Sequence, residues 1–221
     1  MSAKHALFVA FILLSCSLPF GVIDRALSDY FPLETGNYWN YVTQDGDTIS
    51  ARIEGDTVIL GDTAFIYTFG SDLYYFFKAD NGIDRYYYFV TYRGGDKVVL
   101  EKRIGSYLSL PLIDGYARTD SFSNTVVVVN DTFHCFHTVD LRISLVGDLS
   151  VGDRTFHEVY SAEITDSRRV DSPLGTSASE RHEVLCLAPD VGIIRKQEVL
   201  AENGDTVAYS AELIGSNLLG E

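Results

Sequence analysis

The sequence predicts an all-β protein, either an antiparallel sandwich or a half-open β-barrel of about a dozen strands. The 221 residues include 14 Tyr and 13 Phe, and aromatic and β-branched residues favour strands. After Trp39, the single tryptophan, apolar and polar residues alternate, and turn residues interrupt the alternation about every eight to twelve positions. Helical spacing of apolar residues is not found beyond residue 26, so helix is expected only in the N-terminal leader.

Turn residues divide the chain into hairpins. Asp45-Gly46-Asp47, Gly61-Asp62, Asn81-Gly82 and Gly94-Gly95 each separate two alternating segments, and Asn-Gly is a favoured turn for a tight hairpin. The segment 166–180 is rich in Ser, Asp and Arg, which indicates a solvated, mobile loop. The expected strands are 38–44, 49–54, 57–60, 64–69, 73–79, 85–92, 97–103, 125–129, 132–143, 155–164, 181–187, 192–200 and 206–214.

The first 26 residues have the features of an export signal. A polar start is followed by the apolar run 6–14, which is too short to span a membrane. Leu13-Leu14-Ser15-Cys16 resembles a bacterial lipoprotein signal, in which Cys16 is lipidated and becomes the new N-terminus. A signal cut near Ala26 and an uncleaved anchor are the alternatives. All three place residues 27–221, expected to form one all-β domain, outside the cytoplasm: in the periplasm or outer membrane as a lipoprotein, or secreted.

The charge balance excludes some partners. The formal net charge is −14, and no basic stripe is present, so nucleic acid is not an expected partner. Attraction to anionic lipid headgroups is not expected either, so membrane contact would depend on a modified Cys16. Cys135 and Cys186 are the cysteines beyond the leader. They fit a disulfide of an exported protein, or two buried free thiols, and the sequence does not separate these cases.

Three motifs resemble those of a group of uncharacterised bacterial secreted proteins and lipoproteins. The first is Tyr-Phe-Pro-Leu followed by Gly-Asn-Tyr-Trp within residues 30–41, the second is Thr-Phe-His-Cys at 132–135, and the third is Ala-Pro-Asp-Val-Gly at 188–192. The resemblance spans most of the chain beyond the leader. It implies an exported all-β fold and carries no implication for a reaction.

Residues with catalytic or metal-binding chemistry are sparse. Phe133-His134-Cys135-Phe136-His137 places Cys135 and His137 on one face of a strand, but zinc needs a third ligand, for which His157, His182 and Cys186 are the candidates. We interpret the cluster as a core cysteine with incidental histidines. The sequence contains no Gly-x-Ser-x-Gly, Ser-x-x-Lys or His-Glu-x-x-His motif. No metal, cofactor or catalytic residue is therefore predicted, and enzymatic activity is not expected.

The segments 74–77 and 86–92 concentrate tyrosine and phenylalanine on both faces of two adjacent strands. One face fills a core, and the other is either covered by cross-strand pairing or free to bind. The function this suggests is non-enzymatic binding of a lipid, another apolar ligand or an envelope protein. The alternative is a structural or assembly module of the envelope that has no small-molecule ligand. The predicted ligand-binding residues are Tyr74, Phe76, Tyr86, Tyr88 and Tyr92.

Overall fold

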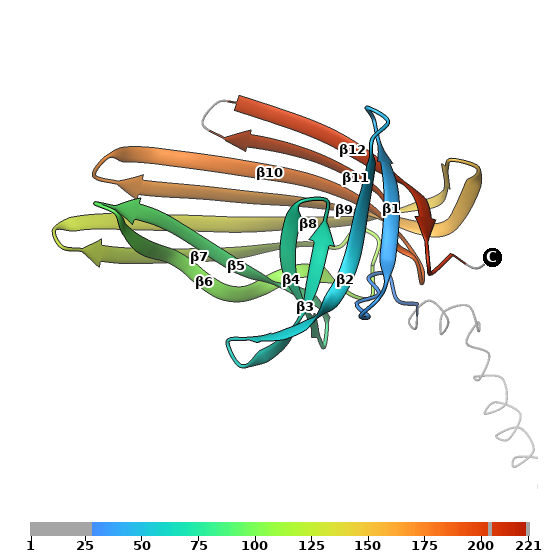
Figure 1. Cartoon of the computed structure of the whole chain (residues 1–221), viewed down its shortest axis with the longest axis horizontal. Coiled ribbons are helices and arrows are strands. Elements are labelled where there is room, and N and C mark those ends of the chain that lie inside the picture. The colour runs from blue at the N-terminus through green and yellow to red at the C-terminus, as the bar shows by residue number, and fades with distance from the viewer. Residues whose placement is uncertain (1–27, 203–204, 220–221) are drawn as a thin grey trace, which may run out of the picture.

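Twelve antiparallel strands form one continuous sheet in the computed structural model, which describes residues 28–202 and 205–219 (Figure 1). The leader and Cys16 lie outside the described residues, and no helix occurs within them. The predicted all-β fold is thus confirmed. The strands are β1 (Tyr38–Thr43), β2 (Thr48–Ile59), β3 (Asp62–Phe69), β4 (Asp72–Ala79), β5 (Gly82–Arg93), β6 (Asp96–Ser109), β7 (Ala117–Val128), β8 (Asp131–Val151), β9 (Arg154–Ser172), β10 (Gly175–Ala188), β11 (Gly192–Glu202) and β12 (Asp205–Ser216).

The strand order is a meander that pairs its first strand with its last. The order is β6-β5-β4-β3-β2-β1-β12-β11-β10-β9-β8-β7, and β1 pairs β12 in antiparallel register from Trp39↔Ser216 to Thr43↔Ala211. The sheet curls so that its two edge strands, β6 and β7, approach each other (Figure 1). The result is a nearly closed, barrel-like sheet.

Side chains join the two edge strands across the remaining seam. Arg103 Nη1 on β6 lies 2.7 Å from the Asp120 carboxylate on β7, and Asn124 Nδ2 donates to the carbonyl of Leu100 at 2.9 Å. A Cβ at position 105 would lie 2.2 Å from Arg103 Nη1, so glycine leaves the room that this ion pair needs. Side-chain bridges therefore replace a backbone ladder at the seam.

The prediction of a loop at residues 166–180 is wrong. It forms the end of β9, a turn at Pro173 and Leu174, and the start of β10, with pairs running from Gly175↔Ser172 to Glu180↔Ser167. Its Ser, Asp and Arg side chains suggested a loop because this end of the hairpin is largely solvated. Backbone pairing on both sides holds it in the sheet, and Val170 is its member of a buried apolar cluster.

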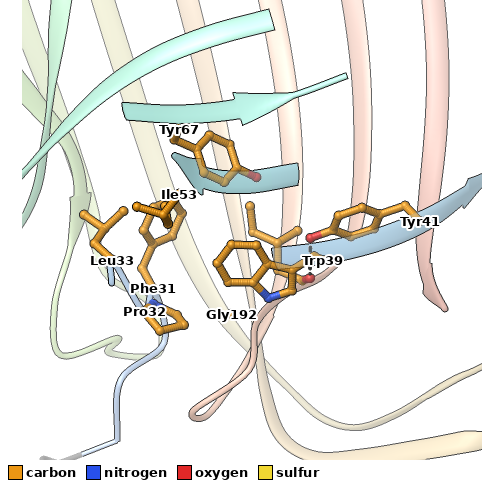
Figure 2. Close-up of a pocket in the computed structure, with 9 residues that line it drawn as sticks. Phe31, Pro32, Leu33, Trp39, Tyr41, Ile53, Tyr67 and Gly192 are labelled. Carbon is orange, nitrogen blue, oxygen red and sulfur yellow. Dashed lines mark hydrogen bonds between the residues drawn. The ribbon is translucent and has the colours of Figure 1, made fainter. Parts of the chain in front are cut away.

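The segment before β1 closes one end of the sheet. Phe31 and Leu33 are buried with Trp39 (Figure 2). Trp39 Nε1 donates to the carbonyl of Val191 at 2.6 Å. Together with Pro32 and other apolar residues they enclose a cavity of about 10 Å³. This is near the lower limit for a single water molecule, so the cavity has no room for a ligand.

A polar layer divides the interior of the sheet. Along β8 the inward side chains are Cys135, His137 and Val139, and along β9 Asp166 lies between Ile164 and Arg168. The apolar residues on the two sides of this layer belong to separate clusters, a large one toward β1 and a small one around Leu100, Phe133, Cys135 and Val170. The charged layer borders a groove near the predicted aromatic residues, to which Asp166 and Arg168 contribute.

Candidate functional site

A groove opens where β4 and β5 separate. The two strands pair only from Ala79↔Gly82 to Phe76↔Arg85; beyond that point β4 continues beside β3 and β5 continues beside β6. The opening has a volume of about 330 Å³, at the lower end of the range for small-molecule sites. It is lined by Leu73, Tyr74, Tyr75, Arg85, Tyr86, Tyr87, Tyr88, Asp166, Arg168, Ser179, Arg181 and Leu200.

The groove gathers three of the five predicted ligand-binding residues. Tyr74, Tyr86 and Tyr88 line it, whereas Phe76 is buried in the core against Phe31 and Tyr107. Tyr92 lies farther along β5, past the bulge after Phe89, and is 65 % exposed. Their role in binding stays a prediction.

The tyrosines belong to two faces of the wall. Tyr74 is buried and faces inward, whereas Tyr86 and Tyr88 stack on each other with ring centroids 6.0 Å apart, and Tyr88 is 44 % exposed. Tyr75 meets Tyr86 edge-on at 6.2 Å. The mouth of the groove is therefore bordered by an outer group of rings, and its floor by an inner one.

Arginines form the charged part of the lining, and sequence reasoning missed them. Arg85, Arg168 and Arg181 line the groove together with one carboxylate, Asp166, in a chain whose net charge is −14. A signal was present: Asp166 and Arg168 alternate with Ile164 and Val170, so both belong to the apolar, inward face of their strand. The alternation predicts on which face of the strand Asp166 and Arg168 lie. It does not predict the curl of the sheet, which brings β5, β9 and β10 together.

His137 connects the groove to the seam through two carboxylates. Its Nδ1 lies 2.7 Å from Glu101 and its Nε2 lies 2.8 Å from Asp166, and the imidazole is fully buried. Burial lowers the pKa of His137, but the hydrogen bonds with Asp166 and Glu101 outweigh burial and raise the pKa above its ordinary value. The pKa values of both carboxylates are lowered, because the interactions with His137 outweigh their burial. The raised pKa favours the protonated imidazole, and His137 bridges Glu101 and Asp166 through its two ring nitrogens.

Arg181 and Lys196 are bound in a second ionic cluster on β10 and β11. Arg181 pairs with Glu198 at 2.7 Å, Asp72 at 3.1 Å and Glu183 at 3.5 Å. Lys196 pairs with Glu198 at 2.9 Å and Glu183 at 3.1 Å. Burial raises the pKa of Glu183, but Lys196 and Arg181 outweigh it and lower the pKa to about 2. These groups are ion-paired and fix the wall of the groove on the β10 side.

The cysteine and histidine cluster forms no metal site in the described part of the chain, where no group of three or more His, Cys, Asp or Glu residues is placed to hold a metal ion. Cys135 and Cys186 are buried free thiols, so of the two possibilities left open by the sequence the structure has the free thiols. His134 points to the other face of β8 and contacts Thr125 at 3.0 Å. His137 is committed to Glu101 and Asp166.

Comparisons with known proteins give no match in sequence and one weak similarity in structure. No protein-family model matches the chain, and no curated protein matches its sequence. A crystal structure of a predicted lipoprotein from Parabacteroides distasonis is similar, with 12 % sequence identity and a TM-score of 0.36. The alignment covers 85 % of this chain and 99 % of that one. Among the residues that the structure describes, no helix is long and apolar enough to cross a membrane.

Proposed function

We propose that this protein is an exported, non-enzymatic binding protein that holds a small ligand with an apolar part in the groove between β4 and β5. The observation that carries the proposal is the separation of β4 from β5 after the pair Phe76↔Arg85, which leaves a groove of about 330 Å³ among tyrosine side chains. The features of an export signal that we expect from the sequence of residues 1–26 support an exported compartment: periplasm or outer membrane if Cys16 is lipidated, and otherwise secreted.

Two leucines favour a ligand with an apolar part. Leu73 and Leu200 line the groove and are 53 % and 38 % exposed. Covering exposed leucine side chains is favourable, at about 25 cal/mol per Å² of apolar surface removed from water. The volume fits a small molecule, whereas a standard protein interface buries about 800 Å² on each partner. The groove therefore favours a small ligand over an envelope protein.

The walls of the groove are pre-organised by their ion pairs. His137 contacts Asp166, and Glu198 with Asp72 contacts Arg181, so these interactions restrain the side chains of the lining. A fixed lining reduces the loss of conformational entropy that binding must overcome.

The alternative of an assembly module rests on free strand edges, yet β6 and β7 face each other and are bridged by Arg103 and Asp120. The edges are thus less available to a partner strand than in an open sheet.

Native mass spectrometry tests the proposal on protein purified gently from the envelope of bacteria that express the full chain. We expect an additional mass that organic solvent removes. Ser179→Trp should abolish it by filling the groove, whereas Ser177→Trp, two residues nearer the β9–β10 turn and outside the lining, should retain it. An additional mass that survives Ser179→Trp, or a wild-type protein that carries no ligand and binds none of the amphiphiles described below, would contradict the proposal.

A further inference from the structure

Arg85 differs from the other two arginines of the groove. Its guanidinium carbon lies 4.7 Å from the ring centre of Tyr74, 5.4 Å from that of Tyr87 and 5.7 Å from that of Tyr107. Arg85 is partly buried and lines the groove. The three rings stabilise the cation through their faces and hold the planar group in one place.

Within the part of the chain that the structure describes, the Arg85 guanidinium forms no hydrogen bond and no ion pair. Arg181 contacts three carboxylates, and Arg168 lies 3.4 Å from Glu101. A guanidinium has five N–H donors and no acceptor. The Arg85 nitrogens are not among the fully buried unsatisfied atoms, so they are open to the groove, and an anion there would gain charge-assisted hydrogen bonds that are stronger than neutral ones.

The neighbouring carboxylates are already engaged. Glu183 accepts from Lys196 and from the hydroxyl of Tyr107, at 3.1 Å in each case. Asp166 is held by His137 at 2.8 Å. The two carboxylates balance the charge of Arg85 at a distance but make no direct contact with its N–H groups. The N–H groups of Arg85 can therefore donate to an anion that enters the groove.

We propose that the ligand is a small amphiphilic anion whose carboxylate or phosphate accepts hydrogen bonds from Arg85, with its apolar part against Leu73 and Leu200. This inference rests on the proposed function, because it assigns the chemistry of a ligand in the same groove. Arginine is suited to the task, since its planar fork binds carboxylate and phosphate through two parallel hydrogen bonds.

Three probes that differ in their headgroup test the proposal by isothermal titration calorimetry on the purified protein. Octanoate carries a carboxylate, monooctyl phosphate carries a phosphate, and octanamide is a neutral isostere of octanoate. We expect at least one of the anions to bind about tenfold more tightly than octanamide, because charged hydrogen bonds are stronger than neutral ones. The preferred anion identifies the headgroup as carboxylate or phosphate.

Substitutions then assign the preference to Arg85. Arg85→Gln should remove it, and Arg85→Lys should keep part of it because the charge remains without the fork. Arg154→Gln is the matched control, since Arg154 is exposed at the start of β9 and does not line the groove. Circular dichroism checks that each variant is folded, and the wild-type comparison of octanoate with octanamide stands even if an Arg85 variant does not fold.

Each outcome has a separate meaning. Anion preference that depends on Arg85 supports the inference. Equal binding of octanoate and octanamide, abolished by Ser179→Trp, overturns the inference and leaves the proposed function intact. Anion preference unchanged in Arg85→Gln also overturns the inference. Failure of all three probes to bind, in a protein that carries no ligand of its own, overturns both.

Discussion

The indole N–H of Trp39 donates a 2.6 Å hydrogen bond to the backbone carbonyl of Val191, 152 residues farther along the chain. This bond joins two of the three motifs singled out in the sequence, the one around Trp39 and the one that ends at Gly192. A second pair of contacts lies beside it: Asp29 and Asp190 exchange hydrogen bonds of 2.9 and 2.8 Å. The two motifs are thus parts of one packed structure, which gives their residue types a physical reason.

Gly192→Ala should destabilise the fold at this contact. Gly192 has φ +89°, and a Cβ there would lie 3.1 Å from Pro32 Cδ, so alanine adds backbone strain and crowding (Figure 2). We expect a loss of about 1–3 kcal/mol in the free energy of unfolding, measured by urea titration. Gly55→Ala is the control, because no atom lies within 4 Å of its Cβ and its φ is not positive. Equal losses in the two variants would contradict this account.

The His137 cluster should make stability depend on pH. The pKa of His137 is raised, so its contribution is complete below the unfolded value of about 6.5 and is lost as pH rises through the folded value. The pKa values of Glu101 and Asp166 are lowered, so their contribution is present above about pH 4 and is lost as pH falls through their folded values. Wild-type stability should therefore be greatest between these limits.

His137→Gln isolates the alkaline part of this dependence. At about pH 6 we expect a loss of roughly 3 kcal/mol, because a buried ionic cluster loses one of its members. The decline of stability toward alkaline pH should become weaker than in wild type, as measured by thermal unfolding across the pH range. His157→Gln serves as the control, since His157 forms an exposed pair with Asp148 that contributes little. An unchanged alkaline decline in His137→Gln would show that other groups cause it.

Most strands and turns could be predicted from the sequence, although the predicted strands 49–54 and 57–60 are one strand, β2, and residues 117–124 of β7 were not expected to be strand. The charged groove could not be predicted. Alternation and the Asn81-Gly82 turn are local signals, and the observed β4–β5 hairpin follows them closely. The 166–180 segment failed as a prediction because its solvated strands lack the apolar alternation by which strands are recognised. Arg85 and Arg168 occupy inward-facing positions on their strands. They lie near each other only because the twelve-stranded sheet closes, and no local sequence pattern specifies that closure.

Asp120→Asn should loosen the seam between β6 and β7. It removes the charge that pairs with Arg103, and the pair is only partly shielded from solvent, so the expected loss of stability is about 0.5–1 kcal/mol. The more sensitive measurement is amide hydrogen exchange, which should accelerate in β6 and β7 and not in β1 or β12. Asp96→Asn removes the same charge at the exposed first residue of β6, which pairs with Arg93 of β5, and should leave exchange unchanged. Equal exchange in both variants would show that the ion pair does not hold the seam.

The two thiols should be unreactive in the folded protein. Burial, followed by the charge of Glu101, raises the pKa of Cys135 to about 11, and burial raises the pKa of Cys186. Thiolate is the reactive form, so Ellman's reagent should label neither residue until the protein unfolds, and then both. The measurement uses Cys16→Ser, which leaves these two cysteines. Rapid labelling under native conditions, or fewer than two thiols after unfolding, would contradict the structure.

The pairing of β1 with β12 has a consequence for how the protein is made. The first strand of the sheet receives its second neighbour only when the last strand has been synthesised, so the ladder from Trp39↔Ser216 to Thr43↔Ala211 forms between the two ends of the chain. Contacts this distant in sequence make folding slow. A chain that stops before Asp205 would expose the edges of β1 and β11 in the middle of the sheet, where they could pair with other copies. Truncation at the C-terminus should therefore cause aggregation rather than a local loss of order.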